Sequence, residues 1–567
     1  MISISNKEWS ERKIDGNLAN KLSQDNNFSQ ILSKLIVSRK FNNEEIYSIN
    51  NFKNLNISNV FKFNKDYKKS VDLVLECINN KEIIYIFGDY DVDGSCSTAL
   101  LFKFFKSINH PVHFYIPDRI KDGYGPSVKL FKKIIQKNPK LIIMVDCGSN
   151  SNDAINFLNK NKVNSLIIDH HQISKPYPKA NFIINPKKDN GYIEYDYFCA
   201  TTLTYFFLDL LSHKIKTNFI LKDYLIFVLL ATVCDVMPLR YINRLIAIKT
   251  LDEFNLNKTM AIKKIYEILD KTNKISINDL GYLIGPILNA GGRLGYSNYA
   301  VKLLSSSDDK EIEFITKKLI ELNQKRKSFE EIVLNNIDYK KIENENENVI
   351  IYYDPTINEG LIGIIAARLK DIFNKPTIVL TKSQDLLKGS ARSIFGFDIG
   401  VVFKNALDIK LIIKGGGHKM AAGFSMNENN LKNFKKFINN SYKRMCKNLK
   451  KNSFFYESKI SSSIFSSNFG EEVNKLYPFG PGNPEPVFLF ERLKISKVKV
   501  LDNKHISNIF ISKNGFSIKS ISFNSINEPI GNYLLNYKKE INVLGCLKDN
   551  FWNNKKTLQL VVRDLII

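Results

Sequence analysis

Short apolar runs alternate with longer helix-like stretches from about residue 80 onward. The runs are rich in Ile and Val and lie at residues 82–87, 112–117, 141–146 and 165–171. Between the first two runs, the segment SCSTALLFKFF has the composition of a helix. Apolar strands separated by helices are typical of βαβ units. We therefore expect a parallel sheet with helices around it.

A long helix is predicted near the middle of the chain. Apolar residues recur there at spacings of three, four and seven, and Asp308 with Glu311 fits a capping pair. A second α/β pattern follows this helix. After about residue 452 the strands become short and alternating, which indicates a small β-barrel.

These patterns predict an α/β chain in five parts. The parts are a helical lead-in at 1–60, the parallel-sheet domain at 61–305, the connecting helix at 306–342, a second α/β domain at 343–452 and the barrel at 453–567. The length of 567 residues agrees with several domains, because one core rarely grows so large.

Composition narrows the class of protein. The longest apolar runs have about ten residues, whereas a membrane span needs roughly 20, and the N-terminus MISISNKEWSERK lacks an apolar signal core. We expect neither membrane insertion nor secretion. The seven cysteines form no CxxC pair, which favours the reduced thiols of a cytoplasmic protein over a disulfide framework. The net charge of +25 indicates a phosphate-rich partner such as nucleic acid, or else AT-rich codons that favour lysine.

Acidic residues follow the predicted strands. Asp89, Asp91 and Asp93 stand at alternate positions in GDYDVDG, directly after the first apolar run. Carboxylates placed so closely repel one another unless a cation lies among them. An EF-hand loop is excluded, because no Glu follows at the required distance.

Further candidate ligands end the other apolar runs: Asp146, His170 and Asp235. In an open parallel sheet, ligands bind beyond the carboxyl ends of the strands, so these side chains are expected to meet there. An oxygen-rich set with imidazole and no thiolate suits Mn²⁺ or Mg²⁺ better than structural zinc. Such a set can hold two cations for the hydrolysis of phosphate esters.

Nine segments of the chain match known motifs. They are GDYDVDG, IPDRIKDGYG, VDCG, DHH, TVCDVMPL, NAGGRLG, GSARS, GGGHKMAAG and PFGPGNPEPVF. In type and order, over nearly the whole chain, they resemble the RecJ family of the DHH phosphoesterase superfamily. The resemblance implies a DHH domain, a connecting helix, a DHHA1-like domain and an OB-fold barrel. It implies an exonuclease specific for single-stranded DNA that works from 5′ to 3′, releases 5′-mononucleotides and serves DNA repair and recombination.

The resemblance also implies the composition of the metal centre. The ligands of two divalent cations, Mn²⁺ or Mg²⁺, would be Asp91, Asp93, Asp146, His170 and Asp235. Asp146 would bridge the two cations. The implied catalytic residues are Asp89, Asp146 and His171. One departure is visible, because Asn358 stands where the family usually has the His of a Trp-His pair.

Candidate phosphate contacts lie in glycine-bearing segments that we expect to be loops. The set is Arg119, Arg293, Ser390, Arg392, Gly416, Gly417 and His418. Arginine forks match phosphate oxygens, and successive backbone N–H groups can cradle them. The alternatives are ordinary surface arginines and glycines that serve only tight turns. In the barrel, basic residues with Phe488, Phe490 and Trp552 suit single-stranded nucleic acid, or are simply solvated lysines around a core.

The resemblance implies single-stranded DNA as substrate, with single-strand-binding protein and a helicase as partners, for a cytoplasmic monomer. Three rival functions remain open. They are a phosphoesterase for short oligoribonucleotides or cyclic dinucleotides, a manganese pyrophosphatase and a catalytically inactive DNA-binding scaffold. The barrel and the GYG and PFGPGNPEP segments argue against the first, because such enzymes typically lack them. The pyrophosphatase family resembles this chain only in the core motifs. The complete set of candidate ligands argues against the last.

Overall fold

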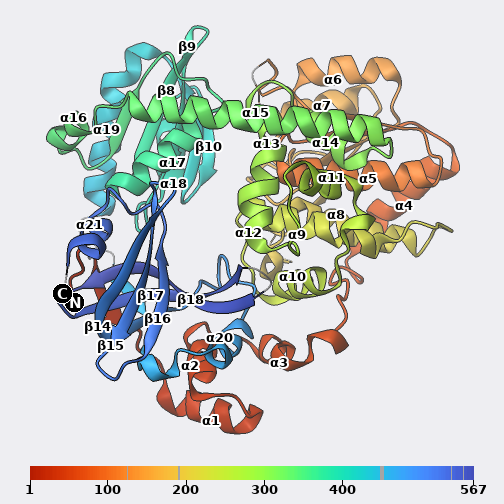
Figure 1. Cartoon of the computed structure of the whole chain (residues 1–567). Coiled ribbons are helices and arrows are strands. Elements are labelled where there is room, and N and C mark those ends of the chain that lie inside the picture. The colour runs from red at the N-terminus through yellow and green to blue at the C-terminus, as the bar shows by residue number, and fades with distance from the viewer. Residues whose placement is uncertain (120, 124, 190–191, 447–452, 538, 553–554) are drawn as a thin grey trace. The chain divides into compact units, whose positions relative to one another are not determined.

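A computed structural model of the chain describes residues 1–119, 121–123, 125–189, 192–446, 453–537, 539–552 and 555–567. The chain forms two compact units (Figure 1). The first unit contains both ends of the chain, namely Met1–Asn56, Pro238–Lys249 and Leu449–Ile567. The second contains Ile57–Met237 and Thr250–Asn448. The five-part division stays a prediction.

A five-stranded parallel sheet organises the first half of the second unit, as predicted. Its strands, in spatial order, are β3 (Val112–Tyr115), β2 (Ile84–Gly88), β4 (Leu141–Val145), β5 (Asn164–Ile168) and β6 (Phe182–Ile184). The chain begins this sheet with β2, adds β3 on one side and then adds β4 on the other. Ligands of open parallel sheets bind at such a switch point, beyond the carboxyl ends of the strands.

Helices cover both faces of this sheet (Figure 1). One face packs against α4 (Lys65–Asn79), α5 (Val92–Ser107) and α8 (Ala200–Ser212), and the other against α6 (Val128–Ile134) and α7 (Asn152–Lys160). Further helices extend the unit: α9 (Leu225–Cys234), α11 (Met260–Ile268), α12 (Ile277–Asp279), α13 (Gly285–Arg293) and α14 (Tyr299–Ser305). Between α9 and α11, helix α10 (Tyr241–Glu253) passes from the first unit into the second.

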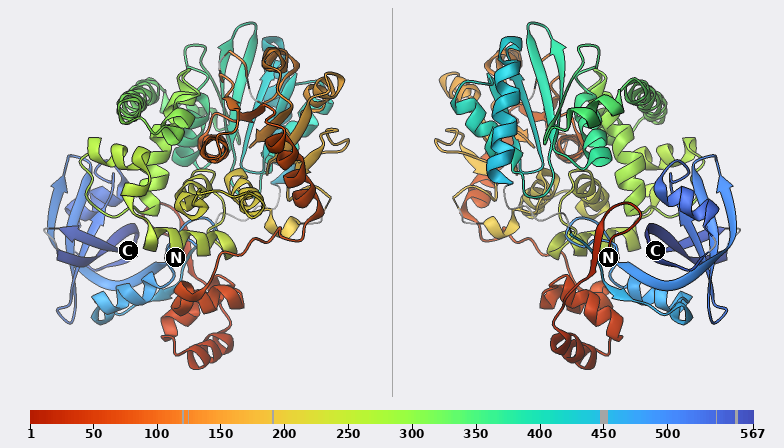
Figure 2. Two further views of the ribbon diagram at one scale, coloured as in Figure 1. Left: turned by 90° about the vertical axis from the view of Figure 1, so that its right-hand side faces the viewer. Right: turned by 90° about the vertical axis from the view of Figure 1, so that its left-hand side faces the viewer.

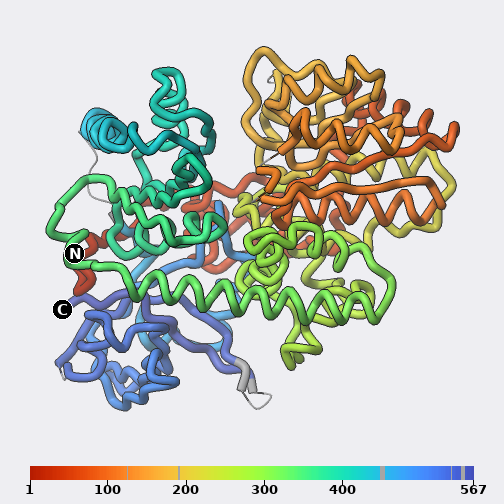
Figure 3. The backbone as a smooth tube through the Cα atoms, turned by 90° about the horizontal axis from the view of Figure 1, so that it is seen from above, coloured from red at the N-terminus to blue at the C-terminus, as the bar shows by residue number. Residues whose placement is uncertain are grey.

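The predicted connecting helix is present as α15 (Asp309–Asn335), a single helix of 27 residues (Figure 3). Asp308 caps it, since its carboxylate accepts from the backbone N–H groups of Lys310 and Glu311. The predicted pair with Glu311 is only half formed, because Glu311 accepts from Ser306 Oγ and the Asp308 N–H donates to Ser306 Oγ. A short helix, α16 (Tyr339–Glu345), follows and leads to the second sheet.

The second sheet of this unit is mixed. Its strands, in spatial order, are β10 (Lys414–His418), β11 (Ala421–Met426), β9 (Leu386–Arg392), β8 (Thr377–Ser383) and β7 (Ile350–Tyr353). Residues of β8 alternate between faces: Ile378 and Leu380 pack with α18 (Ile399–Asp408) and α19 (Leu431–Met445), whereas Val379 packs with α17 (Ile362–Phe373). Figure 2 shows α19 against one face of this sheet.

The first unit contains the predicted barrel. Its strands are β14 (Val487–Leu501), β15 (His505–Ser512), β16 (Ser517–Ser522), β18 (Lys555–Ile566) and β17 (Ile541–Trp552), and β17 pairs with β14 to close it. Two short helices, α20 (Ser467–Asn474) and α21 (Pro529–Asn536), accompany it. A small strand, β13 (Ser458–Lys459), pairs in parallel with β14, and β12 (Ser453–Tyr456) pairs in parallel with β1 (Glu8–Glu11).

The N-terminal helices pack into the core of the barrel. They are α1 (Gly16–Asn26), α2 (Gln30–Ser38) and α3 (Asn43–Asn51), and Leu32 and Leu35 of α2 belong to one apolar cluster with Phe488 and Leu560. At the chain ends, the fully buried Asp564 accepts hydrogen bonds from Ser3 Oγ at 2.7 Å and Trp9 Nε1 at 3.0 Å. Throughout the described residues, no helix is long and apolar enough to cross a membrane.

The Asp564 contacts provide a test of this packing. Asp564→Ala leaves the buried Trp9 N–H without its acceptor, so it should lower the free energy of unfolding by about 2–3 kcal/mol. Denaturant titration followed by tryptophan fluorescence measures the loss. The control is Asp25→Ala, which removes an exposed acid of α1 and should change stability by less than about 0.5 kcal/mol. Equal effects of both substitutions would contradict a structural role for Asp564.

Candidate metal centre

The motif GDYDVDG forms the turn from β2 into α5. Asp91 caps α5, and its carboxylate accepts from Gly94 N–H at 3.0 Å. Gly94 must be glycine, because a Cβ there would lie 2.5 Å from the Asp89 carbonyl oxygen. The tight turn therefore brings Asp89 and Asp91 to the carboxyl end of β2.

Asp93, in the first turn of α5, is held by the start of another helix. Its carboxylate accepts from the backbone N–H groups of Ala200 (2.7 Å) and Thr201 (2.8 Å) at the beginning of α8, and from Thr201 Oγ1 (2.6 Å). A helix N-terminus favours a negative charge. Burial and the neighbouring Asp91 nevertheless raise the pKa of Asp93 to about 6.

Asp146 follows β4 directly and is 1% exposed. Its backbone adopts the left-handed conformation, with φ at 60°. Neither carboxylate oxygen has a hydrogen-bond partner among the described residues. Burial and the nearby carboxylates, first Asp93 and then Asp91, raise the pKa of Asp146 well above its usual value. An unpartnered buried carboxylate is costly unless a cation joins it, so this residue fits a metal ligand.

His170 points its ring at the same group of acids. Its Nε2 lies 3.4 Å from Asp146 Oδ1, 3.4 Å from Asp235 Oδ2 and 3.7 Å from Asp93 Oδ2. Both ring nitrogens are buried, and neither makes a hydrogen bond within the described part of the chain. Burial lowers the pKa of His170 well below its usual value. The imidazole is therefore neutral and has a lone pair available for a cation.

His171 is oriented by Asp169. Its Nδ1 lies 2.8 Å from Asp169 Oδ1, and Asp169 Oδ2 accepts from Ser149 N–H at 3.1 Å. Burial would lower the pKa of His171, but the adjacent Asp169 outweighs burial and raises it to about 9. Burial likewise opposes ionisation of Asp169, yet His171 lowers the pKa of that carboxyl below its usual range. The two form a charged pair beside Asp146, whose Oδ1 lies 3.7 Å from His171 Nδ1.

Asp235 ends α9 and supplies the last acid. Burial, then Asp93 and Asp91, raise its pKa well above the usual value. The next residue, Val236, has φ at 58°, which is an unfavourable conformation for a β-branched side chain. Such strain is typical of functional sites, where the surrounding structure imposes it.

Every predicted ligand belongs to one of three overlapping groups whose candidate ligand atoms lie within 4.8 Å of one another. The groups are Asp89, Asp91 and Asp146; Asp93, His170 and Asp235; and Asp146, His170 and His171. Asp146 and His170 each belong to two groups. The set is oxygen-rich and has two imidazoles, which suits Mn²⁺ or Mg²⁺.

The expectation of loops around the arginines is wrong in two cases. Arg293 ends helix α13 and Arg392 ends strand β9. Their glycines allow close packing: a Cβ on Gly292 would lie 2.9 Å from Tyr90 O, and one on Gly389 would lie 2.2 Å from the Phe424 ring. The glycines in these segments suggested loops, because the sequence alone does not show that another part of the chain packs closely against them.

The three predicted arginines form a group without counter-ions. Within the described residues, no acid pairs with any of them. Arg293 donates to Gly360 O at 3.1 Å, Arg392 donates to Ser390 Oγ at 3.2 Å, and the Arg119 guanidinium lies 5.3 Å from the centre of the Tyr90 ring. Burial first, and then Arg119, lowers the pKa of Arg293 to about 10 and the pKa of Arg392 below its usual value. Uncompensated positive charge of this kind favours an anion.

The glycine-rich segment around Gly416 is also a strand rather than a loop. Gly416, Gly417 and His418 lie in β10, the edge strand of the second sheet, and pair with β11. Part of the backbone that was expected to cradle phosphate is therefore used in the sheet. The His418 ring lies 5.9 Å from the His171 ring, with 23° between their planes. His418 thus brings the second α/β domain to the candidate metal centre.

Asn358 has a local structural role. Its side-chain oxygen accepts from Gly360 N–H at 2.8 Å, and Gly360 O in turn accepts from Arg293. The turn therefore orients the carbonyl that holds Arg293.

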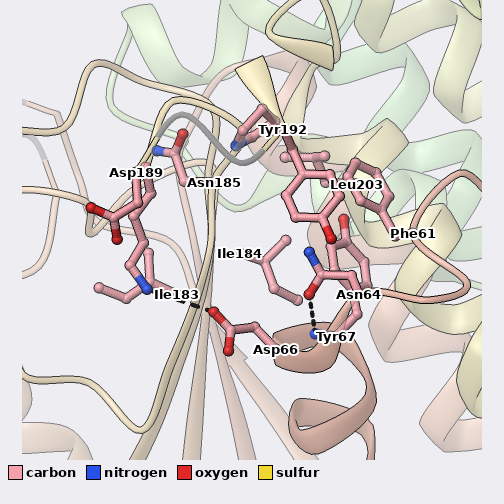
Figure 4. A pocket seen from close by; sticks show the side chains of 12 residues that line it. Phe61, Asn64, Asp66, Tyr67, Ile183, Ile184, Asn185, Asp189, Tyr192 and Leu203 are labelled. Carbon is pink, nitrogen blue, oxygen red and sulfur yellow. Dashed lines mark hydrogen bonds and ion pairs between the residues drawn. The ribbon is translucent and has the colours of Figure 1, made fainter. Parts of the chain in front are cut away.

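Sequence reasoning missed two residues that hold the backbone carbonyls of His170 and His171. Asn185 Nδ2 donates to His171 O at 2.9 Å, and Lys187 Nζ donates to His170 O at 2.5 Å. Both follow β6, and no motif singled them out. Beside them lies a cavity of about 130 Å³ lined by Asn185, Phe61 and Tyr67 among others (Figure 4). The cavity contains none of the predicted ligands.

In the barrel, two of the three aromatic residues considered for base stacking are buried. Phe488 and Phe490 are 0% exposed and belong to the core, while the side chain of Trp552 lies outside the described residues. The basic residues of β14 are exposed, including Arg492, Lys494, Lys497 and Lys499.

Three family models match the chain. "DHH family, N-terminal domain" matches residues 83–232, "DHHA1 domain" matches 346–444 and "RecJ OB domain" matches 456–564. The single-stranded-DNA-specific exonuclease RecJ of Bacillus subtilis is 27% identical, over 99% of this chain and 71% of the relative. That of Haemophilus influenzae is 29% identical, over 87% of this chain and 89% of the relative. The chain therefore has a DHH domain, a DHHA1 domain and a RecJ OB domain, and it is similar to RecJ exonucleases over most of its length.

Solved structures of RecJ show the same fold. The Thermus thermophilus RecJ in complex with Mn²⁺ has a TM-score of 0.80 at 22% identity, covering 99% of this chain and 79% of that one. An exonuclease RecJ bound to manganese has a TM-score of 0.57 at 25% identity, covering 68% and 96%. The predicted fold is therefore confirmed: a parallel-sheet DHH domain, a DHHA1 domain and an OB barrel.

The crowded carboxylates predict an unusual pH dependence of the metal-free protein. Folding raises the pKa values of Asp146 and its neighbours, so the folded chain binds more protons than the unfolded chain. This contribution to stability is complete below about pH 4 and is lost as pH rises through about 6 and above. Asp146→Asn removes one buried charge and should stabilise the metal-free protein by about 1–3 kcal/mol at pH 8, and by less at pH 5.

Thermal and denaturant unfolding in a chelator at the two pH values measure this difference. The control is Asp252→Asn, which removes an exposed acid and should change stability equally little at both pH values. Destabilisation by Asp146→Asn at pH 8 would show that Asp146 is not a repelled, unpartnered anion.

Proposed function

We propose that this chain is a metal-dependent exonuclease that degrades single-stranded DNA from 5′ to 3′ and releases 5′-mononucleotides. One observation carries the proposal. The Asp146 carboxylate is buried with both oxygens free of hydrogen bonds, among acids and imidazoles that all lie at one edge of a parallel sheet. The curated relatives named RecJ are exonucleases specific for single-stranded DNA, which supports the assignment.

The chain's acids and His170 have defined roles in this proposal. Asp91, Asp93, Asp146, His170 and Asp235 would hold two divalent cations, Mn²⁺ or Mg²⁺. Cations bound there lower the pKa of a coordinated water and offset the charge of the phosphoryl oxygens.

Two further residues, His171 and Asp89, complete the proposed catalytic group. Asp169 keeps the His171 ring in place and in its charged form, so that His171 faces the phosphate as a cation. Asp89 accepts from Tyr90 N–H at 2.8 Å, and this bond holds its carboxylate at the end of β2.

The arginines bind the backbone of the DNA. Arg119 and Arg293 hold phosphates near the scissile bond, and Arg392 with Ser390 binds the 5′-terminal phosphate. A terminal phosphate carries up to two charges and three acceptor oxygens, more than an internal diester does. An arginine that reads this group therefore sets the direction of digestion. Gly416, Gly417 and His418 complete the substrate-binding set from β10.

The remaining parts of the proposal concern the surroundings of the enzyme. The exposed basic residues of β14 bind single-stranded DNA through its phosphates. We infer a monomeric cytoplasmic enzyme of DNA repair and recombination that works with single-strand-binding protein and a helicase.

The direct test is digestion of end-labelled oligonucleotides. With Mn²⁺ or Mg²⁺, single strands should be shortened from the 5′ end to mononucleotides, blunt duplexes should persist, and EDTA should stop the reaction. Asp146→Asn should reduce the rate by at least about 1,000-fold, because the site would lose a buried anionic ligand for the cations, while binding of single strands in Ca²⁺ is retained. Digestion from the 3′ end, or more than a few per cent residual activity in the variant, would contradict the proposal.

A second test concerns the 5′ end. Arg392→Ala should lower kcat/KM on 5′-phosphorylated oligonucleotides by about 10- to 100-fold, which corresponds to about 1.5–3 kcal/mol for a charge-assisted contact. It should affect 5′-hydroxyl oligonucleotides much less. The control is Arg368→Ala in the same domain, which removes an exposed arginine paired with Glu330 at 2.7 Å and should change neither substrate. Equal losses on both substrates would show that Arg392 does not recognise the terminal phosphate.

A further inference from the structure

The ring of His170 lacks the support that a metal-ligating histidine usually has. Such a histidine normally donates its second ring N–H to a carboxylate, carbonyl or water, which fixes the orientation of the ring. In this chain, His170 Nδ1 is buried without a partner among the described residues. Something other than the ring itself must therefore hold Nε2 toward Asp93, Asp146 and Asp235.

The peptide backbone of His170 is held on both sides. Its N–H donates to Asp169 Oδ1 at 2.8 Å, and its carbonyl oxygen accepts from Lys187 Nζ at 2.5 Å. Asn185 holds the next carbonyl, that of His171, at 2.9 Å, and also donates to Ser149 Oγ at 2.8 Å. Asn185 Oδ1 in turn accepts from Lys187 N–H at 2.9 Å. The segment after β6 thus fixes both carbonyls of the histidine pair.

Lys187 is not explained by an ion pair. Across the described residues, no carboxylate lies within 4.0 Å of its ammonium, and the His170 carbonyl is its hydrogen-bond partner. A lysine so close to a site for cations would by charge alone weaken their binding. Its position is therefore better explained by the hydrogen bond that it donates.

We infer that Lys187 is a positioning residue for the metal centre: by holding the His170 carbonyl, it orients the His170 ring toward the cations. The inference rests on the proposed metal-binding role of His170. Lys187 acts through the backbone of His170. Its hydrogen bond to the carbonyl takes the place of the one that His170 Nδ1 does not make.

Mn²⁺ binding to the full-length, metal-free protein tests this role independently of hydrolysis. Lys187→Met should weaken Mn²⁺ binding by about 10-fold or more, as measured by calorimetry or by the EPR signal of free Mn²⁺. Lys187→Arg can still donate to the carbonyl and should restore most of the affinity. The matched control is Lys188→Met, which removes the neighbouring lysine that pairs with Asp66 at 3.7 Å and should leave Mn²⁺ binding unchanged.

Whether Lys187→Met weakens or strengthens Mn²⁺ binding separates the possible roles of Lys187. Tighter Mn²⁺ binding by Lys187→Met would show that Lys187 acts through charge alone and would overturn the inference. Unchanged binding with a lowered melting temperature would show a merely structural role and would overturn it as well. Absence of Mn²⁺ binding to the unsubstituted protein would contradict the proposed metal centre itself, a result distinct from failure of the Lys187 inference.

Discussion

Repulsion among the carboxylates around Asp146 is the constraint that the surrounding structure accommodates. Burial and mutual proximity raise the pKa values of Asp89, Asp93, Asp146 and Asp235 in the metal-free chain. The structure partly compensates by directing the N-terminus of α8 at Asp93 and by pairing Asp169 with His171. Asp146 itself accepts no hydrogen bond from the described residues, and the nearest charged ring, that of His171, lies 3.7 Å away. The protein therefore sacrifices stability at this point, as expected where function needs a strong cation site.

The sequence allowed the sheet and the candidate ligands to be predicted, because one geometric rule connects them. Residues that follow parallel strands meet at one edge, so Asp89 after β2 and Asp146 after β4 had to lie close together. The RecJ resemblance added their roles. The conformations around Arg293 and Arg392 could not be predicted in the same way. Glycine marks a loop and a close contact alike, and the contacting Tyr90 and Phe424 lie far away in sequence.

Lys187 and Asn185 illustrate a different limit. Neither lies at the end of an apolar run or in a recognised motif, and their relevant contacts are with backbone carbonyls. Every residue has a backbone carbonyl, so the sequence does not show which carbonyl a lysine or asparagine side chain will contact. Only the structure reveals that the ring of His170 lacks a hydrogen-bond partner and that its backbone is held instead.

The core of the first unit joins the two ends of the chain. Apolar residues of α2, such as Leu32, pack with Phe488 and Leu560, and Trp9 donates to Asp564. Translation delivers the N-terminus first, so helices α1–α3 leave the ribosome long before the barrel strands that complete their core have been made. The second unit has its own separate cores and does not depend on this delay. Truncation of the chain before β18 would therefore damage the first helices, because they would be left with part of their apolar faces in water.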